Sequence, residues 1–180
     1  MALEQNFELM AKYNQWMNKQ VYSAAAELDD LELREDRGAF FGSILGSLNH
    51  ILVGDIVWLK RFAEHPKNYK SLQYLNSLSK PLVLTEILHS DFNELQKARI
   101  KMDEVIVKFS MEASEKDYEL GLSFKNMKGQ PFKKNFGFLV QHFYNHQTHH
   151  RGQVTTLFSQ QGIDVGVTDL LALIPEAEMV

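Results

Sequence analysis

Apolar residues recur at three- and four-residue steps over long stretches of the chain, the spacing of one face of an α-helix. The first stretch, Leu3–Leu28, ends at a pair of aspartates. The second, Phe40–Phe62, stops shortly before Pro66, because the residue before a proline disfavours helical backbone. These patterns predict two long amphipathic helices in the first third of the chain.

A third helix is predicted after a polar connection over Lys67–Lys80. It opens near Pro81 and Thr85, a combination typical of helix N-termini, and extends to Phe109. Its expected core residues follow the same helical spacing, with one less regular member, and are Ile87, Leu88, Phe92, Leu95, Ile100, Val105 and Phe109.

The period changes from helical to alternating over Tyr118–Phe124, and Asn126–Pro131 then supplies turn residues. This predicts a small hairpin or an extended excursion. A fourth helix is predicted over Lys134–Gln161, with Gly162 as its C-terminal cap, and the tail Ile163–Val180 is expected to be loosely structured with an apolar middle. Four long amphipathic helices predict an all-α four-helix bundle, with residues 1–180 as a single domain.

Composition places the chain among ordinary globular proteins, with 180 residues, 44% hydrophobic and 23% charged. The formal net charge of -4 disfavours nucleic acid or an anionic membrane as a partner. There is no cysteine, which excludes disulfides, thiolate ligands and a cysteine nucleophile. The N-terminus has no basic signal-peptide region, and no apolar run approaches the ~20 residues of a membrane span, so we expect a cytoplasmic protein.

Histidines are concentrated in the fourth predicted helix, where four of the seven fall within ten residues. His142, His146 and His150 are four residues apart, so they form a stripe on one helix face, the same face as Leu139 and Leu157. Imidazoles that point toward a core need partners, and two at this spacing can converge on one metal ion. The spacing alone does not choose between the pairs His142/His146 and His146/His150.

A third ligand should come from a facing helix, and His50 is the best candidate. His65, beside a proline, and His89, among polar residues, are expected to be exposed. The helical neighbours of His50 are small, and they are Ser43, Gly46, Ser47 and Gly54. This trough indicates either close helix packing or, as we prefer, an open coordination position beside a substrate cleft.

Three segments of the chain resemble signatures of the DinB-like (damage-inducible protein B) metalloproteins. They are the run Asn145–Gln153, which contains His-His-Arg-Gly-Gln, the run Leu48–Leu59, and the weaker first-helix pattern Tyr13–Asn18. They occur in the right order and cover nearly the whole chain. The resemblance implies a four-helix bundle, often a homodimer, with one divalent metal bound by three histidines. The matching positions in this sequence are His50, His146 and His150.

Three further polar residues of the fourth helix lie near this face. His142 and His149 match no ligand position, and we expect them to be core imidazoles or outer partners of the ligands. Gln153 either holds a water or substrate or caps a polar pocket.

Two charged residues lie beside the same elements. Arg151 points about 100° away from His150 around the helix, which favours an ion pair with another helix over a direct role. Asp55 lies on an apolar stripe and needs a partner, and a buried hydrogen bond between helices is preferred over a contact with a ligand histidine. Trp16, Trp58 and Tyr13 are expected to be core aromatics.

Three functions are compatible with such a site, which would take zinc, nickel or iron. By resemblance to bacillithiol and mycothiol S-transferases, the first is an enzyme that activates a low-molecular-weight thiol for transfer to an electrophile. The second is a metal-dependent hydrolase that uses a bound hydroxide, although no acid follows the histidine pair as a general base. The third is a non-catalytic, stress-related binding module, in which a structural metal would need a fourth protein ligand.

Overall fold

The structure is a computed structural model that describes residues 2–177, and it is mostly helical, as predicted. Four long helices make up most of it, namely α1 (Leu3–Ala25), α3 (Ile44–Phe62), α4 (Phe92–Glu112) and α6 (Phe136–Ser159). The shorter elements are α2 (Asp30–Arg34), α5 (Glu115–Glu119), the 3₁₀ helices η1 (Lys70–Ser77) and η2 (Leu170–Leu173), and the strands β1 (Gly121–Lys125) and β2 (Pro131–Asn135).

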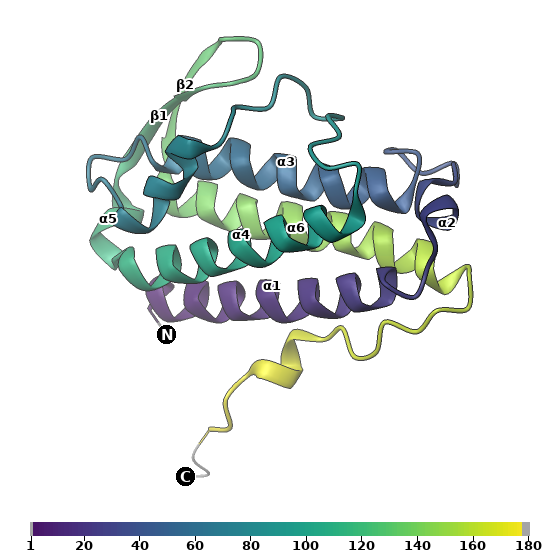
Figure 1. Ribbon diagram of the computed structural model, residues 1–180. Helices are drawn as coiled ribbons and strands as arrows, with labels where there is room; N and C mark the ends of the chain where they lie inside the picture. The colour runs from purple at the N-terminus through teal and green to yellow at the C-terminus, as the bar shows by residue number, and fades with distance from the viewer. Residues whose placement is uncertain (1, 178–180) are drawn as a thin grey trace.

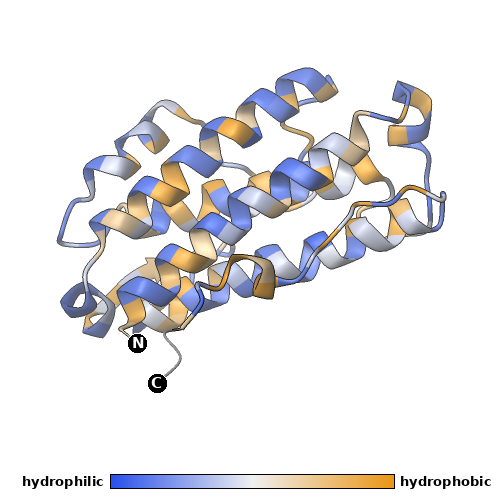
Figure 2. Ribbon diagram, turned by 90° about the horizontal axis from the view of Figure 1, so that it is seen from below, coloured by the Kyte–Doolittle hydropathy of each residue, from blue (hydrophilic) through white to orange (hydrophobic). Residues whose placement is uncertain are grey.

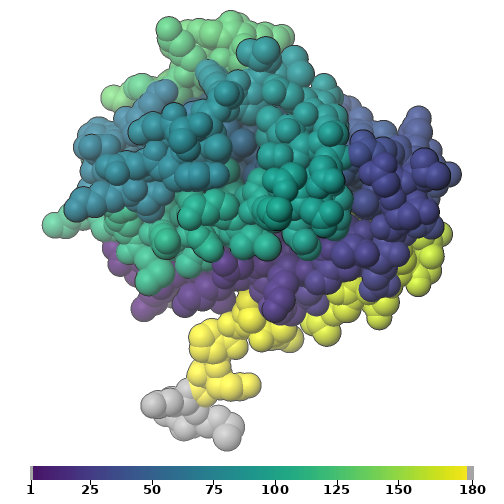
Figure 3. All heavy atoms as spheres, viewed as in Figure 1, coloured from purple at the N-terminus to yellow at the C-terminus, as the bar shows by residue number. Residues whose placement is uncertain are grey.

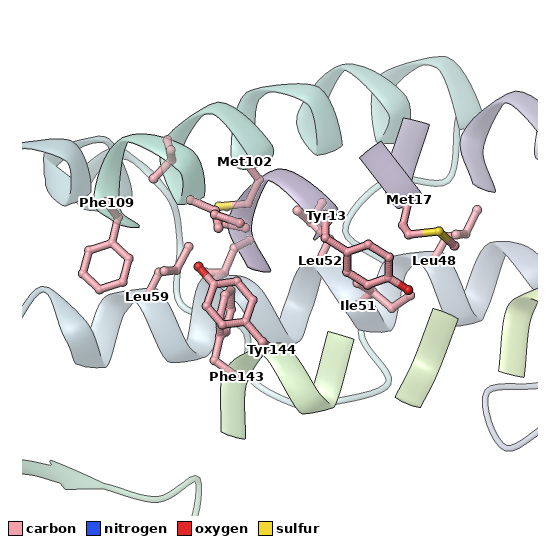
Figure 4. Packing of buried hydrophobic residues seen from close by; sticks show 14 of the residues in the cluster. Tyr13, Met17, Leu48, Ile51, Leu52, Leu59, Met102, Phe109, Phe143 and Tyr144 are labelled. Atoms are coloured by element: carbon pink, nitrogen blue, oxygen red, sulfur yellow. The ribbon is translucent and has the colours of Figure 1, made fainter. Parts of the chain in front are cut away.

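The four long helices lie side by side, with α1 against α4 and α6, and α3 against α4 and α6 (Figure 1). Apolar and polar residues alternate around each helix (Figure 2), so each can turn an apolar stripe inward. Their buried side chains converge between the helices (Figure 4), among them Met17, Leu52, Met102 and Phe143. This packing determines which face of α3 lies against α6 and which face of α6 lies against α3.

The first two predicted helices are both shorter than the periodicity indicates. The α1 helix ends at Ala25, and a separate turn, α2, follows because Asp29 and Glu32 cap each other's backbone amides at 2.9 and 2.8 Å. The α3 helix begins at Ile44, where the Ser43 hydroxyl accepts a hydrogen bond from the Gly46 amide at 3.0 Å. The residues before Ser43 form a tight turn instead of helix.

The predicted start of the third helix near Pro81 and Thr85 is wrong. The α4 helix begins at Phe92, and its cap is Asp91, which accepts a hydrogen bond from the amide of Glu94 at 2.9 Å. Residues 81–91 are irregular because tertiary contacts hold them. Two of the predicted core residues are consequently misplaced, since Ile87 in this segment and Ile100 on the outer side of α4 are about half exposed, at 49% and 56%.

The segment between α3 and α4 is more ordered than a polar connection. The η1 helix buries Leu72 and Leu75 against the core. Residues 82–91 then return to the α3 helix, where the side chain of Asn49 exchanges two hydrogen bonds of 3.0 Å with the backbone of His89. This return brings a backbone carbonyl to the site described below.

The predicted excursion between the last two long helices is a hairpin, in which β1 and β2 pair antiparallel and Phe124 is opposite Phe132. A short helix that the sequence reading missed, α5, precedes it. The hairpin (green) projects from one side of the body and the C-terminal segment (yellow) from another (Figure 3). Gly162 has a φ of 75°, the left-handed conformation expected of a helix end.

The C-terminal tail is tied to α1 over part of its length. The Tyr13 hydroxyl donates to the carbonyl of Thr168 at 2.7 Å, and the Gln20 amide donates to that of Val167 at 2.9 Å. The last residues of the predicted tail, 178–180, lie outside the described residues. Between residues 2 and 177, no helix has both the length and the apolar character that crossing a bilayer requires.

Candidate metal centre

Three histidines from two facing helices meet at one end of the α3–α6 contact. His50 comes from α3, and His146 and His150 come from successive turns of α6. One ring nitrogen from each lies within 4.8 Å of the other two, so the group could hold a metal ion. The structure therefore pairs His146 with His150 and leaves His142 outside the group.

The hydrogen bonds of two of these rings fix which nitrogen carries the proton. His50 Nδ1 donates to the carbonyl of Leu84 at 2.8 Å, and His150 Nδ1 donates to Oε1 of Gln153 at 2.8 Å. Each Nε2 atom is then a bare acceptor, yet the two Nε2 atoms lie only 3.2 Å apart. Two nitrogen lone pairs cannot hydrogen-bond to each other. The arrangement therefore suits a metal ion that both Nε2 atoms coordinate.

His146 has the most strongly lowered pKa of the three. Its Nδ1 is buried and has no hydrogen-bond partner among the described residues. Burial, followed by the neighbouring His150 and His50, lowers the pKa of His146 to about 3. Burial likewise lowers the pKa of His50 and of His150. All three rings are thus neutral near pH 7, which is the form that binds a metal.

The metal-free protein is expected to lose stability as the pH falls. A histidine in the unfolded chain titrates near ~6.5, whereas the pKa of His146 in the fold is about 3. The unfolded state therefore binds more protons between these values, so acidification below about pH 6.5 favours unfolding. Urea unfolding of chelator-treated protein at several pH values measures this. His146→Leu should flatten the profile, and an unchanged slope in that variant would contradict the assignment.

Gly54 leaves the space that the His146 ring occupies. A β-carbon at Gly54 would lie 2.5 Å from Cε1 of His146, closer than any real contact. Gly54→Ala should therefore displace the ring and weaken metal binding by about 10-fold or more, comparable to the loss of an outer partner of a ligand. Isothermal titration with zinc checks this.

The matched control for that substitution is Gly152→Ala. Gly152 lies on the ligand helix α6, and a β-carbon there meets nothing within 4 Å. It should raise stability by up to about 1 kcal/mol through helix propensity and leave metal affinity unchanged. Equal affinities for both alanine variants would show that Gly54 does not protect the ligand ring.

Phe41 is a site residue that the sequence reading missed. Its ring stacks on His50 with centroids 3.7 Å apart and meets the edge of His150 at 5.5 Å. The pattern placed it in the second predicted helix, whereas it lies in the turn before α3, where Gly42 has a φ of 73°. The Leu84 carbonyl was missed because a backbone acceptor has no signature in the side-chain pattern.

Comparisons with known proteins show the family of the chain. The family model described as "DinB family" matches residues 1–178. The chain belongs to the DinB family. It is also 24% identical to "Protein DinB" of Bacillus subtilis (strain 168) over 163 residues, which cover 88% of this chain and 87% of that protein. No solved structure gave a significant match.

In this DinB-family chain, His142 and His149 are exposed, so their predicted place in the core is wrong. The His142 ring packs against Trp58 at 4.9 Å, and the His149 ring lies beside His150 at 4.8 Å. Both rings lie at the solvent-exposed edge of α6, where His142 still contacts α3 through Trp58, and the other alternative, an outer partner of a ligand, stays a prediction. Gln153 contacts the site directly, through its bond to His150.

His65 also differs from its prediction, since it is buried at 2% exposure. Its ring stacks against Tyr69 and Phe136, at 5.3 and 4.6 Å. Residues distant in sequence cover it, which the adjacent proline does not reveal. His89 is half-buried, and neither histidine belongs to the three-histidine group.

A buried polar network lies behind the histidines and joins the four long helices. Asp55 of α3 forms an ion pair with Arg99 of α4, the helix-pairing role preferred from the sequence. Arg99 also pairs with Asp103 at 2.9 Å, and Asp103 accepts a hydrogen bond from Asn18 of α1 at 2.8 Å. These side chains are all almost fully buried.

Arg151 of α6 joins the same network differently from its prediction. Within the described residues it forms no ion pair, and it donates instead to the side-chain carbonyl of Asn14 on α1 and, at 3.4 Å, to that of Gln147. Arg151 and Gln147 each follow a ligand histidine by one residue. The network therefore sets the rotation of α6 that turns His146 and His150 toward α3. Tyr13 is a buried aromatic, as expected, and Trp16 and Trp58 are half-buried.

Proposed function

We propose that this protein binds one divalent transition-metal ion through His50, His146 and His150 and uses it to activate a low-molecular-weight thiol for transfer to an electrophile. The single observation that carries the metal site is the pair of bare Nε2 atoms of His50 and His150, 3.2 Å apart and unable to bond to each other. The orphaned, buried nitrogen of His146 supports it. The four long helices, which we regard as a four-helix bundle, serve as its scaffold.

The donor set fits a catalytic rather than a structural ion. A structural zinc site is normally closed by four protein ligands, whereas the group here has three. Imidazole suits zinc, nickel and iron alike, so the identity of the metal stays open. Such an ion supplies Lewis acidity, which lowers the pKa of a thiol that binds to it.

The residues of the chain hold and shield this site. The Leu84 carbonyl and the Gln153 side chain fix the ligand tautomers of His50 and His150, and the Phe41 ring covers one face of His50 against water. The sequence contains no cysteine, so a nucleophilic thiol has to come from a second substrate. No Asp or Glu among the described residues joins the three-histidine group to act as the base of a hydrolase, and Asp55 of α3 is engaged by Arg99. This favours thiol transfer over hydrolysis.

The test is consumption of a thiol by the metal-loaded protein. Cysteine, glutathione and bacillithiol are each offered with monobromobimane as electrophile, to wild type and to His50→Ala. Metal-dependent thiol consumption that is lost in His50→Ala supports the proposal. Stoichiometric metal without consumption of any thiol contradicts the transferase function, and ester hydrolysis by the same sample would establish the hydrolase in its place.

A further inference from the structure

A basic cavity of about 850 Å³ lies between α3 and the β1–β2 hairpin, away from the three histidines. Its charged lining consists of five cations and one acid, namely Lys60, Arg61, Lys80, Lys125, Lys133 and Glu64. These residues are spread over more than 70 positions of the sequence, where no basic cluster is evident. The fold gathers them on one side of a protein whose net charge is -4.

The protein neutralises these five cations only in part, through Glu64. None of the five forms an ion pair with any residue in the range 2–177. Burial lowers the pKa of Lys60 most. The like charge of Lys80 lowers this pKa further by repulsion. A cluster of this kind is unfavourable by itself, and an anion bound among its members would relieve the repulsion.

Arg61 is held in a fixed place at the inner end of this cavity. Its guanidinium lies over the rings of Trp58 and Phe124, 4.5 and 5.0 Å from their centroids. The N–H donors of a guanidinium fixed in this way can bind a ligand without a further loss of side-chain conformational entropy. Their planar arrangement matches a carboxylate or a phosphate.

A second, aromatic cavity of about 570 Å³ adjoins the first through Phe124, which lines both. Trp58, Phe138 and His142 also line it. The His142 ring is 6.4 Å from the ring of His146, centroid to centroid. The second cavity therefore reaches from Phe124 to His142, which lies one helical turn from His146.

We propose that the basic cavity binds a small organic anion, whose carboxylate or phosphate group lies among Arg61, Lys125 and Lys133 and whose planar apolar part extends past Phe124 toward Trp58 in the adjoining cavity. Cavities of several hundred Å³ are the size that takes small molecules. A single cluster of five cations on a negatively charged protein does not offer the extended basic track that nucleic acid requires. This binding does not depend on the thiol chemistry proposed above.

The test uses 1-naphthyl phosphate and 1-naphthoate, which combine the two features and chelate metals weakly. Isothermal titration is carried out on wild type and on the double variant Lys125→Gln/Lys133→Gln. The control, Lys116→Gln/Lys128→Gln, removes the same charge from exposed positions outside the cavity. We expect the cavity variant to bind at least about 10-fold more weakly and the control to change less than about 2-fold, with affinity falling as salt is added.

Each outcome decides for or against the proposal. Binding of the phosphate alone, or of the carboxylate alone, supports it and names the anionic group. No binding of either probe at about 5 mM overturns it, as does an equal loss in the control variant, which would indicate only an effect of net charge. Binding to single-stranded RNA or to anionic vesicles without binding to either probe assigns the cations to a macromolecular surface instead.

Discussion

His146→Ala is expected to abolish stoichiometric metal binding at neutral pH. The substitution removes one of three ligands from a site in which the other two, His50 and His150, remain only 3.2 Å apart at their Nε2 atoms. Loss of an outer partner alone costs about 10–100-fold in metal affinity, so loss of a ligand should cost more than ~100-fold. Competition with a calibrated chelator measures the affinity.

The matched control is His149→Ala, which removes an exposed imidazole from the same helix beside His150. It should retain one metal per chain with unchanged affinity, because His149 is outside the three-histidine group. His65→Ala is a poorer control because its ring is buried and its loss would unsettle the fold. Full metal binding by His146→Ala would contradict the site, and loss in His149→Ala would point to a closed, four-ligand site.

Arg99→Met is expected to reduce the free energy of unfolding by about 3–5 kcal/mol, the usual cost of breaking a buried ion pair by removing one partner. Arg99 lies between Asp55 and Asp103, and all three side chains are at most 5% exposed. Without the guanidinium, two carboxylates share a buried space, and protonating them recovers only part of the loss. Urea unfolding at neutral pH measures the change.

Lys97→Met provides the control on the same helix. Lys97 pairs with Glu94 at 2.8 Å, but the two side chains are 71% and 57% exposed. Such surface pairs contribute about 0–1 kcal/mol, so this variant should unfold nearly as wild type does. If Arg99→Met were equally mild, the network that joins α1, α3, α4 and α6 would not hold the helices as described.

The helices could be predicted from periodicity, but several of their ends could not. Asp91 with Glu94 and Ser43 before Ile44 are local capping signals, and both are readable in the sequence. The cap at Asp91 was overridden by the apparent N-terminal signal of Pro81 and Thr85, and the cap at Ser43 by the apolar residues Phe40 and Phe41 before it. Residues 81–91 remain irregular because Asn49 and His50 bond to their backbone, and no local pattern encodes such a contact.

In the candidate site, too, some features could be predicted from the sequence and others could not. The placement of His146 and His150 on one face of α6 follows from their four-residue spacing. The small residues Gly46 and Gly54 near His50 admit the Phe41 backbone and the His146 ring, which is the close packing given as the alternative to an open cleft. The resemblance was needed to choose between the histidine pairs, whereas His50 was the best third ligand already from its small helical neighbours. Phe41 and the Leu84 carbonyl depend on the path of two loops. The burial of His65 depends on the distant Phe136.

The most direct test of the proposed metal centre is the X-ray absorption spectrum of protein loaded with one equivalent of zinc at neutral pH. The structure predicts three imidazole nitrogens at about 2.0–2.1 Å and a further light ligand from solvent. A protein that takes up no stoichiometric zinc, or a spectrum with fewer than three imidazoles, would contradict the assignment of His50, His146 and His150.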